Sequence, residues 1–199
     1  MTTNESGFCE PVTEFKPCDL VFKIARSQAE LEGFWGLRRE IFCEEQKIFL
    51  KTDVDEHDKS MIPIVALSLV MGMEDEVVGV VRIHEQEPGV WYGSRLGVHR
   101  DFRRVSLSSA VPIRNQQSGL HAPRSVGAGL IYKAVSTANA LGCKEFFAHV
   151  QRKNAAFFRR LHWKPLGDVE LHGIPHVRMQ VDLNFYPPGE HDIDLPRVA

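Results

Sequence analysis

Apolar and polar residues alternate along this chain with two different periods, which mark strands and helices. The segment 20–26 (LVFKIAR) begins a β-prone apolar run, and Ser27 with Glu30 matches a capping box that starts a helix. Six residues of this helix fall near one face: Leu31, Phe34, Trp35, Arg38, Ile41 and Phe42. The pattern predicts a strand followed directly by an amphipathic helix.

Three further β-prone segments follow an acidic loop at 51–60. They are 64–73 (IVALSLVMGM), 76–85 (EVVGVVRIHE) and 91–99 (WYGSRLGVH). Turn signals at 74–75 and 88–89 separate them. The first two of these segments predict a β-meander.

A polar stretch at 103–124 shows no sustained period, and connections of this length inside a domain are often lids or disordered. A helix that begins at two glycines and ends at Gly142 comes next. The last elements are a strand at 144–150, a helix from about Asn154, and strands at 166–171 and 176–183. We expect one mixed α/β domain at 20–184 with an insertion at about 103–123, an extension at 1–19 and a tail at 185–199.

The composition is that of an ordinary globular protein. The 199 residues are 43% hydrophobic and 25% charged, with a formal net charge of −2. This net charge does not indicate binding to nucleic acid or to an anionic membrane surface. No apolar run approaches the roughly 20 residues that cross a bilayer. The four cysteines show no C-x-x-C spacing and the N-terminus has no signal-peptide pattern, so we expect a cytoplasmic protein.

The segment RSVGAGLI (124–131) places Gly127 and Gly129 at the start of a helix, although glycine is a poor helix former. One explanation is close packing of the helix against a sheet. The other is a set of bare backbone N–H groups that cradle an anion such as a phosphate. A P-loop is excluded because Leu130 follows Gly129, and a dinucleotide fingerprint is disfavoured because Tyr132 stands at its third glycine.

Three segments in this order resemble the GNAT (GCN5-related N-acetyltransferase) superfamily. Arg124, Gly127 and Gly129 match its coenzyme A pyrophosphate loop, Gln/Arg-x-x-Gly-x-Gly/Ala. The segment SRLGVHRDFRR resembles the strand that leads into that loop, and NAAFFRRLHWKPLG resembles the later Asn-led helix and strand. The resemblance covers about 21–183 and is closest to a bacterial N-acetyltransferase branch named for nitrogen starvation.

The resemblance implies an α/β (α+β) fold in which helices flank a central mixed sheet whose two middle strands, here 93–98 and 144–150, splay apart. Acetyl-CoA would lie in the slot between them as the acyl donor, without a metal. The implied coenzyme A contacts are Leu96, Gly97, Val98, Arg103, Arg104, Arg124, Val126, Gly127, Ala128, Gly129, Leu130 and Asn154.

The resemblance also implies individual roles for these contacts. A backbone N–H near Leu96 would stabilise the oxyanion, and Val98 would pair with the pantetheine arm. The amides of 126–130 would hold the diphosphate.

Several positions depart from the family pattern. Arg124 would add a cation to the loop, but about twenty extra residues precede it, so Arg103 or Arg104 is an alternative source of that charge. Asn154 would either contact the pantetheine arm or N-cap the last helix. Phe158 stands where many relatives carry the tyrosine that protonates the leaving thiolate, so that role is open.

An amine must lose a proton to become a nucleophile, which calls for a general base. Glu85 is the first candidate, with a solvated strand-end carboxylate as the alternative interpretation. His149 has a suitable pKa range but is equally interpreted as a core histidine. Tyr92 is a third candidate, otherwise a packing residue.

The acidic loop offers a second kind of site. Asp55 and Asp58 would attract a cationic amine substrate. The alternatives are a solvated loop or ion pairs with Arg38 and Arg39. A metal site using His57 fits neither EF-hand nor zinc spacing, so no metal is expected.

Together these features predict an acetyl-CoA-dependent N-acetyltransferase whose small-molecule amine attacks the thioester directly in a ternary complex. A homodimer is a further implication of the resemblance, and neither nucleic acid nor membrane is an expected partner. Two alternatives stay open: a non-catalytic coenzyme A-binding regulatory module, and an acyl-homoserine-lactone-type synthase. The intact Gly127 and Gly129 count against the second alternative, because such synthases generally lack a good pyrophosphate loop.

Overall fold

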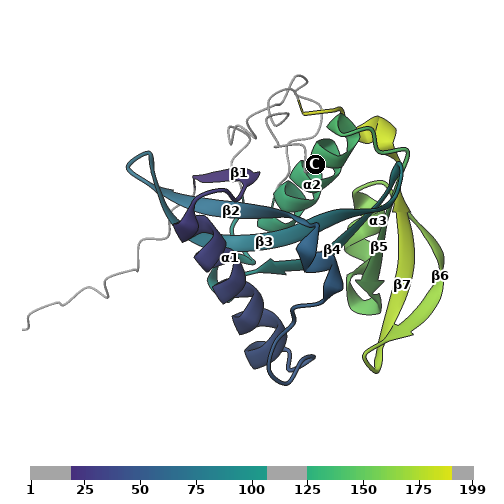
Figure 1. The fold of residues 1–199 in the computed structure, drawn as a ribbon, viewed down its shortest axis with the longest axis horizontal. Coiled ribbons are helices and arrows are strands. Elements are labelled where there is room, and N and C mark those ends of the chain that lie inside the picture. The colour runs from purple at the N-terminus through teal and green to yellow at the C-terminus, as the bar shows by residue number, and fades with distance from the viewer. Residues whose placement is uncertain (1–18, 107–124, 190–199) are drawn as a thin grey trace, which may run out of the picture.

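Seven strands form one mixed sheet in the computed structural model, which describes residues 19–106 and 125–189 (Figure 1). The order across the sheet is β1-β2-β3-β4-β5-β7-β6. The strands are β1 Leu20–Ile24, β2 Ile62–Val70, β3 Met73–Glu87, β4 Val90–Val98, β5 Glu145–Gln151, β6 Trp163–Leu171 and β7 Ile174–Val181. The α-helices are α1 Gln28–Arg39, α2 Val126–Ala140 and α3 Ala155–Arg160. The shorter turns are the π-helical η1 Glu40–Glu45 and the 3-10 turns η2 Glu56–Lys59, η3 Arg100–Phe102, η4 Arg152–Asn154 and η5 Leu183–Phe185.

The parallel pair at the centre of the sheet is short. Neighbouring strands pair antiparallel everywhere except between β4 and β5. That parallel pairing joins Val90–Gly93 to Glu145–Ala148 and goes no further, although both strands continue. The two strands therefore splay apart, as the sequence predicted.

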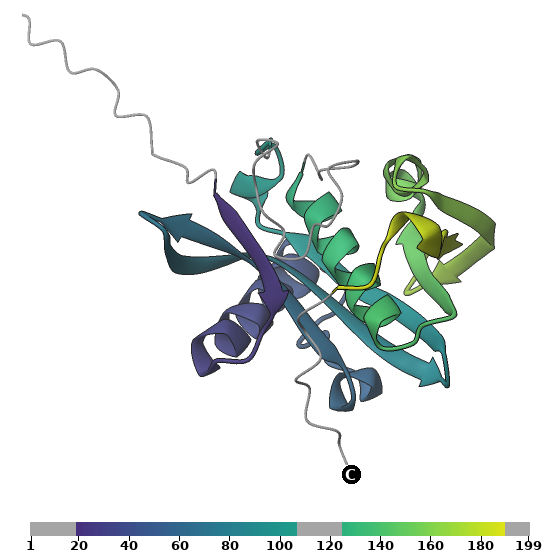
Figure 2. The same cartoon turned by 90° about the horizontal axis from the view of Figure 1, so that it is seen from above.

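Helices cover both faces of the sheet (Figure 2). On β2, Ile64 and Ala66 pack into the apolar cluster that contains α2, while Val65 and Leu67 pack into the cluster that contains α1. Side chains alternate between the faces of a strand, so one strand serves both layers. Because helices cover both faces, side chains on both sides of the central strands are buried, and these strands are continuous apolar segments of the sequence.

The predicted start of α1 is confirmed, and its end differs from the prediction. The Ser27 side chain accepts a hydrogen bond from the Glu30 N–H at 3.2 Å, and the Glu30 carboxylate accepts one from the Ser27 N–H at 3.2 Å. Beyond Arg39 the helix widens into the π-helical turn η1, which buries Ile41 and Phe42. Such wide turns often lie at functional sites.

The first residues of the predicted tail, up to Gly189, are described. Among them Tyr186 is buried, and its hydroxyl donates a hydrogen bond to the Leu161 carbonyl oxygen at 2.6 Å. Asn154 precedes α3 but makes no side-chain capping bond. No helix in the described part of the chain is both long and apolar enough to span a membrane.

Candidate functional site

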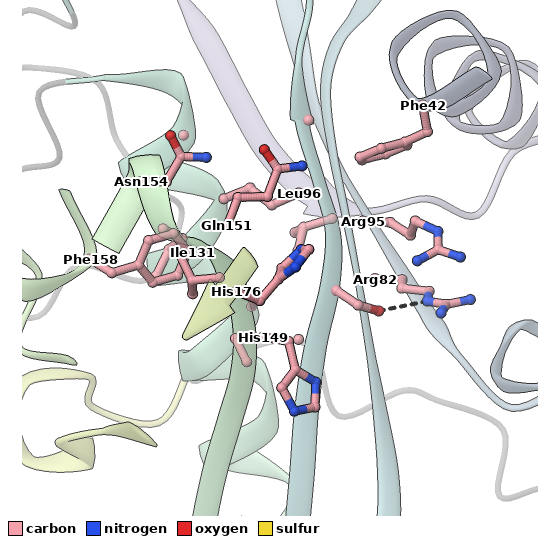
Figure 3. Close-up of a pocket in the computed structure, with 18 of the residues that line it drawn as sticks. Phe42, Arg82, Arg95, Leu96, Ile131, His149, Gln151, Asn154, Phe158 and His176 are labelled. Atoms are coloured by element: carbon pink, nitrogen blue, oxygen red, sulfur yellow. Dashed lines mark hydrogen bonds between the residues drawn. The ribbon is translucent and has the colours of Figure 1, made fainter. Parts of the chain in front are cut away.

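A cavity of about 800 Å³ opens where β4 and β5 part. Its walls come from both sides of the sheet (Figure 3): Ile131 and Phe158 lie on the side of α2 and α3, and Phe42 lies on the side of α1. Leu96 of β4 and His149 of β5 stand between them. The cavity thus passes through the sheet at the splay.

A β-bulge in β4 shapes the wall of this cavity. The register against β3 shifts between Val80 and Arg82, so Arg95 and Leu96 together oppose one residue of β3. Arg95 has a φ of 53°, in the left-handed region that is uncommon for residues other than glycine. Because β5 no longer pairs here, the backbone at Leu96 has no partner strand on that side.

The two glycines of α2 have different surroundings. Gly127 lines the cavity, and an added Cβ would lie 3.8 Å from the Phe157 ring, an ordinary contact. Gly129 is buried, and an added Cβ would collide with the ring of Phe22 on β1. Close packing therefore explains Gly129, whereas the anion interpretation rests on Gly127.

The N–H groups at the start of α2 are only partly available. The Gly129 N–H donates to the Ser125 carbonyl oxygen at 3.0 Å, and the Ala128 N–H donates to the Ser125 hydroxyl at 3.3 Å. Helix geometry leaves the N–H groups of Val126 and Gly127 without an intrahelical acceptor. Leu130, also a predicted contact, lies fully buried in the core. The predicted amide cradle thus narrows to Val126 and Gly127.

The sequence predicts several basic contacts at the end of the cavity near the start of α2. Arg124 lies outside the described residues, and Arg104 is exposed and does not line the cavity. Arg103 lines it, and its two terminal nitrogens donate to the Glu45 carboxylate at 2.7 and 2.6 Å. This bidentate pair raises the pKa of Arg103 and lowers the pKa of Glu45. Lys153, which the sequence did not single out, also lines the cavity.

Arg103 also contacts the strand next to the cavity. Its Nε donates a hydrogen bond to the Val98 carbonyl oxygen at 2.9 Å. Gly97 is packed tightly, because an added Cβ would lie 2.7 Å from Ile41 Cδ1. Val98, Gly97 and Asn154, which the sequence analysis lists as cofactor contacts, all line the cavity.

An ion-pair network joins the acidic loop to α1, β3 and β4. Its members are Arg38, Asp53, Asp55, Asp58, Arg82 and Arg95. Three arginines face three aspartates, and the Arg38 and Arg82 side chains are almost fully buried. Buried charges of this kind need full pairing, which the network provides.

The two predicted substrate carboxylates belong to this network. Asp58 pairs with Arg38 and Arg82, each at 2.6 Å, and does not line the cavity. Burial alone would raise the pKa of Asp58, but hydrogen bonds from both arginines outweigh burial and lower it to about 2. Asp55 lines the cavity while its carboxylate pairs with Arg82 and Arg95. The ion-pair interpretation of the loop thus applies, with Arg38 rather than Arg39 as partner.

A row of rings crosses the α1 side of the cavity. His84 of β3 is 5% exposed and stacks on His57 of η2, with ring centroids 4.3 Å apart. Tyr92 of β4 lies 6.0 Å from His84 and 5.9 Å from His149. All four residues line the cavity. The sequence pointed to Tyr92 and His149 but missed His84 and the ring contact of His57.

Burial keeps two of these imidazoles neutral. Burial, with the nearby His57 and Arg82, lowers the pKa of His84 to about 4. Burial, with Arg178 and His176, also lowers the pKa of His149. A neutral imidazole carries one N–H donor and one acceptor nitrogen, so each ring can donate one hydrogen bond and accept another.

Glu85 stands apart from this row. It is exposed and does not line the cavity, and its carboxylate accepts a hydrogen bond from the Gly89 N–H at 2.7 Å in the β3–β4 turn. Phe158 does line the cavity, with its ring 5.2 Å from that of Trp163. The structure thus brings Tyr92 and His149 together at the cavity and leaves Glu85 outside.

The described part of the chain shows neither a metal cluster nor a reactive thiol at the cavity. Among residues 19–106 and 125–189, no group of three or more His, Cys, Asp or Glu side chains is arranged to hold a metal ion. Burial raises the pKa of Cys143 to about 12 and also raises that of Cys43. Both cysteines are therefore protonated and poor nucleophiles at neutral pH.

Comparison with known proteins identifies the fold. No family model matches the sequence, and no significant match exists among curated proteins. Among solved structures, a protein assigned as an N-acetyltransferase from Lactobacillus plantarum is 18% identical, with a TM-score of 0.64 over 83% of this chain and 99% of that one. An acyl-CoA N-acyltransferase from Pseudomonas aeruginosa is 19% identical, with a TM-score of 0.57 over 82% of this chain and 99% of that one.

A third structure comes from another class of enzyme. BjaI, a coenzyme A-dependent acyl-homoserine lactone synthase solved with SAM and isopentyl-CoA, is 18% identical, with a TM-score of 0.56 over 83% of each chain. At these identities the likeness concerns the fold. The chain has the mixed-sheet fold of the acyl-CoA N-acyltransferases, as the sequence predicted.

Proposed function

We propose that this protein is an acyl-CoA-dependent N-acyltransferase that moves an acetyl group from acetyl-CoA to the amine of a small molecule. One observation carries the proposal: the parted strands β4 and β5 open a cavity, and the start of α2 at Gly127 forms part of its wall. The shared fold supports the same assignment. Within the superfamily, we propose the branch named for nitrogen starvation as the nearest relatives.

The residues around the cavity fit coenzyme A. We propose that the N–H groups of Val126 and Gly127 bind the diphosphate. Gly127 lines the cavity, as do Arg103 and Lys153, which would add positive charge. On the side that faces β5, the backbone of β4 beyond Gly93 has no partner strand and offers hydrogen bonds to the amides of a pantetheine arm. Bound acetyl-CoA would supply an activated thioester to this site.

The proposed reaction is direct attack by the amine within a ternary complex. A backbone N–H at the Leu96 bulge stabilises the negative charge that develops on the thioester oxygen. His149 accepts the proton that the amine nitrogen loses as the C–N bond forms and the C–S bond breaks. A coenzyme A thiol has a pKa near 8.5, so its thiolate can leave although Phe158 cannot protonate it.

His149 is preferred as the base because of its position. Its imidazole lines the cavity next to Tyr92, whose hydroxyl accepts a hydrogen bond from Arg178 at 3.2 Å. Glu85, by contrast, has its carboxylate in a turn outside the cavity. We expect His149→Gln to lower kcat by about 100-fold or more and Glu85→Gln to leave it within a few-fold.

A screen of amines and amino acids for thiol release from acetyl-CoA tests the proposed function. Release that depends on a specific amine supports it. Acetyl-CoA binding by calorimetry without release for any amine would indicate the non-catalytic binding module. Absence of both binding and release would overturn the proposal.

A lactone synthase is a second candidate, favoured by the structural likeness to BjaI over 83% of each chain. The panel therefore includes SAM as acceptor, with acetyl-CoA and isopentyl-CoA as donors. Release of methylthioadenosine together with the coenzyme A thiol would identify this activity. Thiol release with simple amines and none with SAM would exclude it.

A further inference from the structure

The α1 side of the cavity, which we name the acceptor compartment, is defined by six lining residues: Asp55, His57, Arg82, His84, Tyr92 and Arg95. Figure 3 shows Arg82 and Arg95 on the opposite side of the splay from Ile131 and Phe158. In the proposed function coenzyme A binds at the end of the cavity near α2, so the acceptor amine would occupy the acceptor compartment. The side chains of this compartment indicate which class of amine can bind there.

No described residue offers this cavity an uncommitted carboxylate. Among residues 19–106 and 125–189, the carboxylates that line it are those of Glu45 and Asp55. Both oxygens of Glu45 accept hydrogen bonds from Arg103, at 2.7 and 2.6 Å. Both oxygens of Asp55 accept hydrogen bonds from Arg82, at 2.7 and 2.6 Å, and one also accepts from Arg95 at 3.0 Å. An alkylammonium ion would find no unpaired counterion here.

The arginines of the lining use up its negative charges. Arg82 and Arg95 pair with Asp53, Asp55 and Asp58, and Arg103 pairs with Glu45. An ammonium ion entering the compartment would lose its hydration without gaining an unpaired counterion. An amine that is already uncharged at neutral pH avoids this cost.

His84 supplies a neutral polar group in the same compartment. It is 5% exposed, and neither ring nitrogen has a hydrogen-bond partner among the described residues. Its low pKa, about 4, leaves it as neutral imidazole with one donor and one acceptor nitrogen. A buried polar group without a partner is unfavourable, and a ligand that hydrogen-bonds to it would offset that cost.

Flat rings surround this polar group. His57 stacks on His84 with an interplanar angle of 24°, and Tyr92 lies nearly parallel to His84, at 22°. Such a wall favours a planar ligand that can stack against it.

We propose that the acceptor is a weakly basic aromatic amine, which enters the acceptor compartment uncharged, stacks on its rings and donates a hydrogen bond to His84. The proposal deepens the proposed function and rests on it. The lone pair of such an amine is available without prior deprotonation. As the C–N bond forms and the C–S bond breaks, the nitrogen proton passes to His149 and then to the leaving sulfur.

Three probe amines test this proposal in thiol release from acetyl-CoA: aniline, benzylamine and cyclohexylamine. Aniline is flat and uncharged at neutral pH, benzylamine is flat and cationic, and cyclohexylamine is puckered and cationic. We expect kcat/KM for aniline to exceed that of both others by about tenfold or more. Equal or faster turnover of either cationic amine would overturn the proposal, as would no turnover of all three when another amine of the wider screen is acetylated. Failure of acetyl-CoA binding would instead overturn the proposed function.

Variants of His84 provide an independent readout. His84→Leu should raise KM for aniline about tenfold with little change in acetyl-CoA affinity, and His84→Gln, which keeps a donor and an acceptor, should restore part of the loss. Circular dichroism confirms that each variant is folded. Unchanged KM for aniline in folded His84→Leu would remove His84 from the acceptor site.

Discussion

Gly127 and Gly129 lie two positions apart, yet their backbones meet different neighbours. Gly127 faces the cavity with room for a methyl group, whereas Gly129 presses against the buried ring of Phe22. The same residue type thus serves ligand access at one position and helix–strand packing at the other. Each role predicts its own response to substitution.

Gly127→Glu should weaken acetyl-CoA binding by about 100-fold or more, because a carboxylate would stand where the diphosphate is proposed to bind. Gly127→Ala is the matched control, since its Cβ would lie 3.8 Å from Phe157 and should change affinity only a few-fold. Calorimetry with acetyl-CoA measures both. Equal affinity of the Glu variant and the wild type would contradict the cofactor assignment.

Gly129→Ala should destabilise the fold by about 1–3 kcal/mol, because its methyl group would overlap the Phe22 ring. Urea unfolding measures the loss. Phe22→Leu in the same chain removes the ring and should recover part of it. If Gly129→Ala unfolded at the same urea concentration as the wild type, close packing would not explain this glycine.

At the scale of elements, the sequence predicted what local signals specify. The capping box and apolar stripe predicted α1, and the glycine-led run predicted α2. The π-helical turn η1 and the bulge at Arg95 were not predicted. Both depend on contacts from distant segments, such as the packing of Ile41 against Gly97, and local propensity does not report these.

The turn η1 connects to both sides of the splay. Glu45 pairs with Arg103, which follows β4, and Gln46, just after η1, accepts a hydrogen bond from Gln151 of β5 at 3.1 Å. Arg103, one proposed diphosphate ligand, therefore already has an anionic partner. Coenzyme A would compete with Glu45 for it.

Glu45→Gln should strengthen acetyl-CoA binding by up to about fivefold, because an exposed ion pair is worth about 0.2–1 kcal/mol and its loss leaves Arg103 to the diphosphate. Glu44→Gln is the matched control: this neighbour is exposed and pairs with Arg39, at 3.4 Å, away from the cavity. Calorimetry at low salt compares the two. No difference between the variants would argue against competition at Arg103.

At the scale of the whole molecule, the fold was more predictable than the acceptor compartment. The sequence placed a candidate base at Glu85, while the neighbouring His84 faces the cavity. The residues Val78–His84 are all buried because helices cover both faces, so no alternation reveals which side each one faces. Likewise, nothing local decides which of three arginines meets which of three aspartates.

Burial of His84 couples this compartment to the stability of the whole fold. Its pKa is about 4 when folded, against an ordinary value of 6.5, so below pH 6.5 the unfolded chain takes up a proton that the folded chain excludes. The free energy of unfolding should therefore fall between pH 6.5 and 4, by about 3 kcal/mol from this residue, and change little above pH 7. Urea unfolding at pH 7.5 and 4.5 measures the loss, and His84→Gln should reduce it by about that amount. An equal loss in wild type and variant would mean that His84 titrates normally, and that the acceptor compartment is open to protons and water.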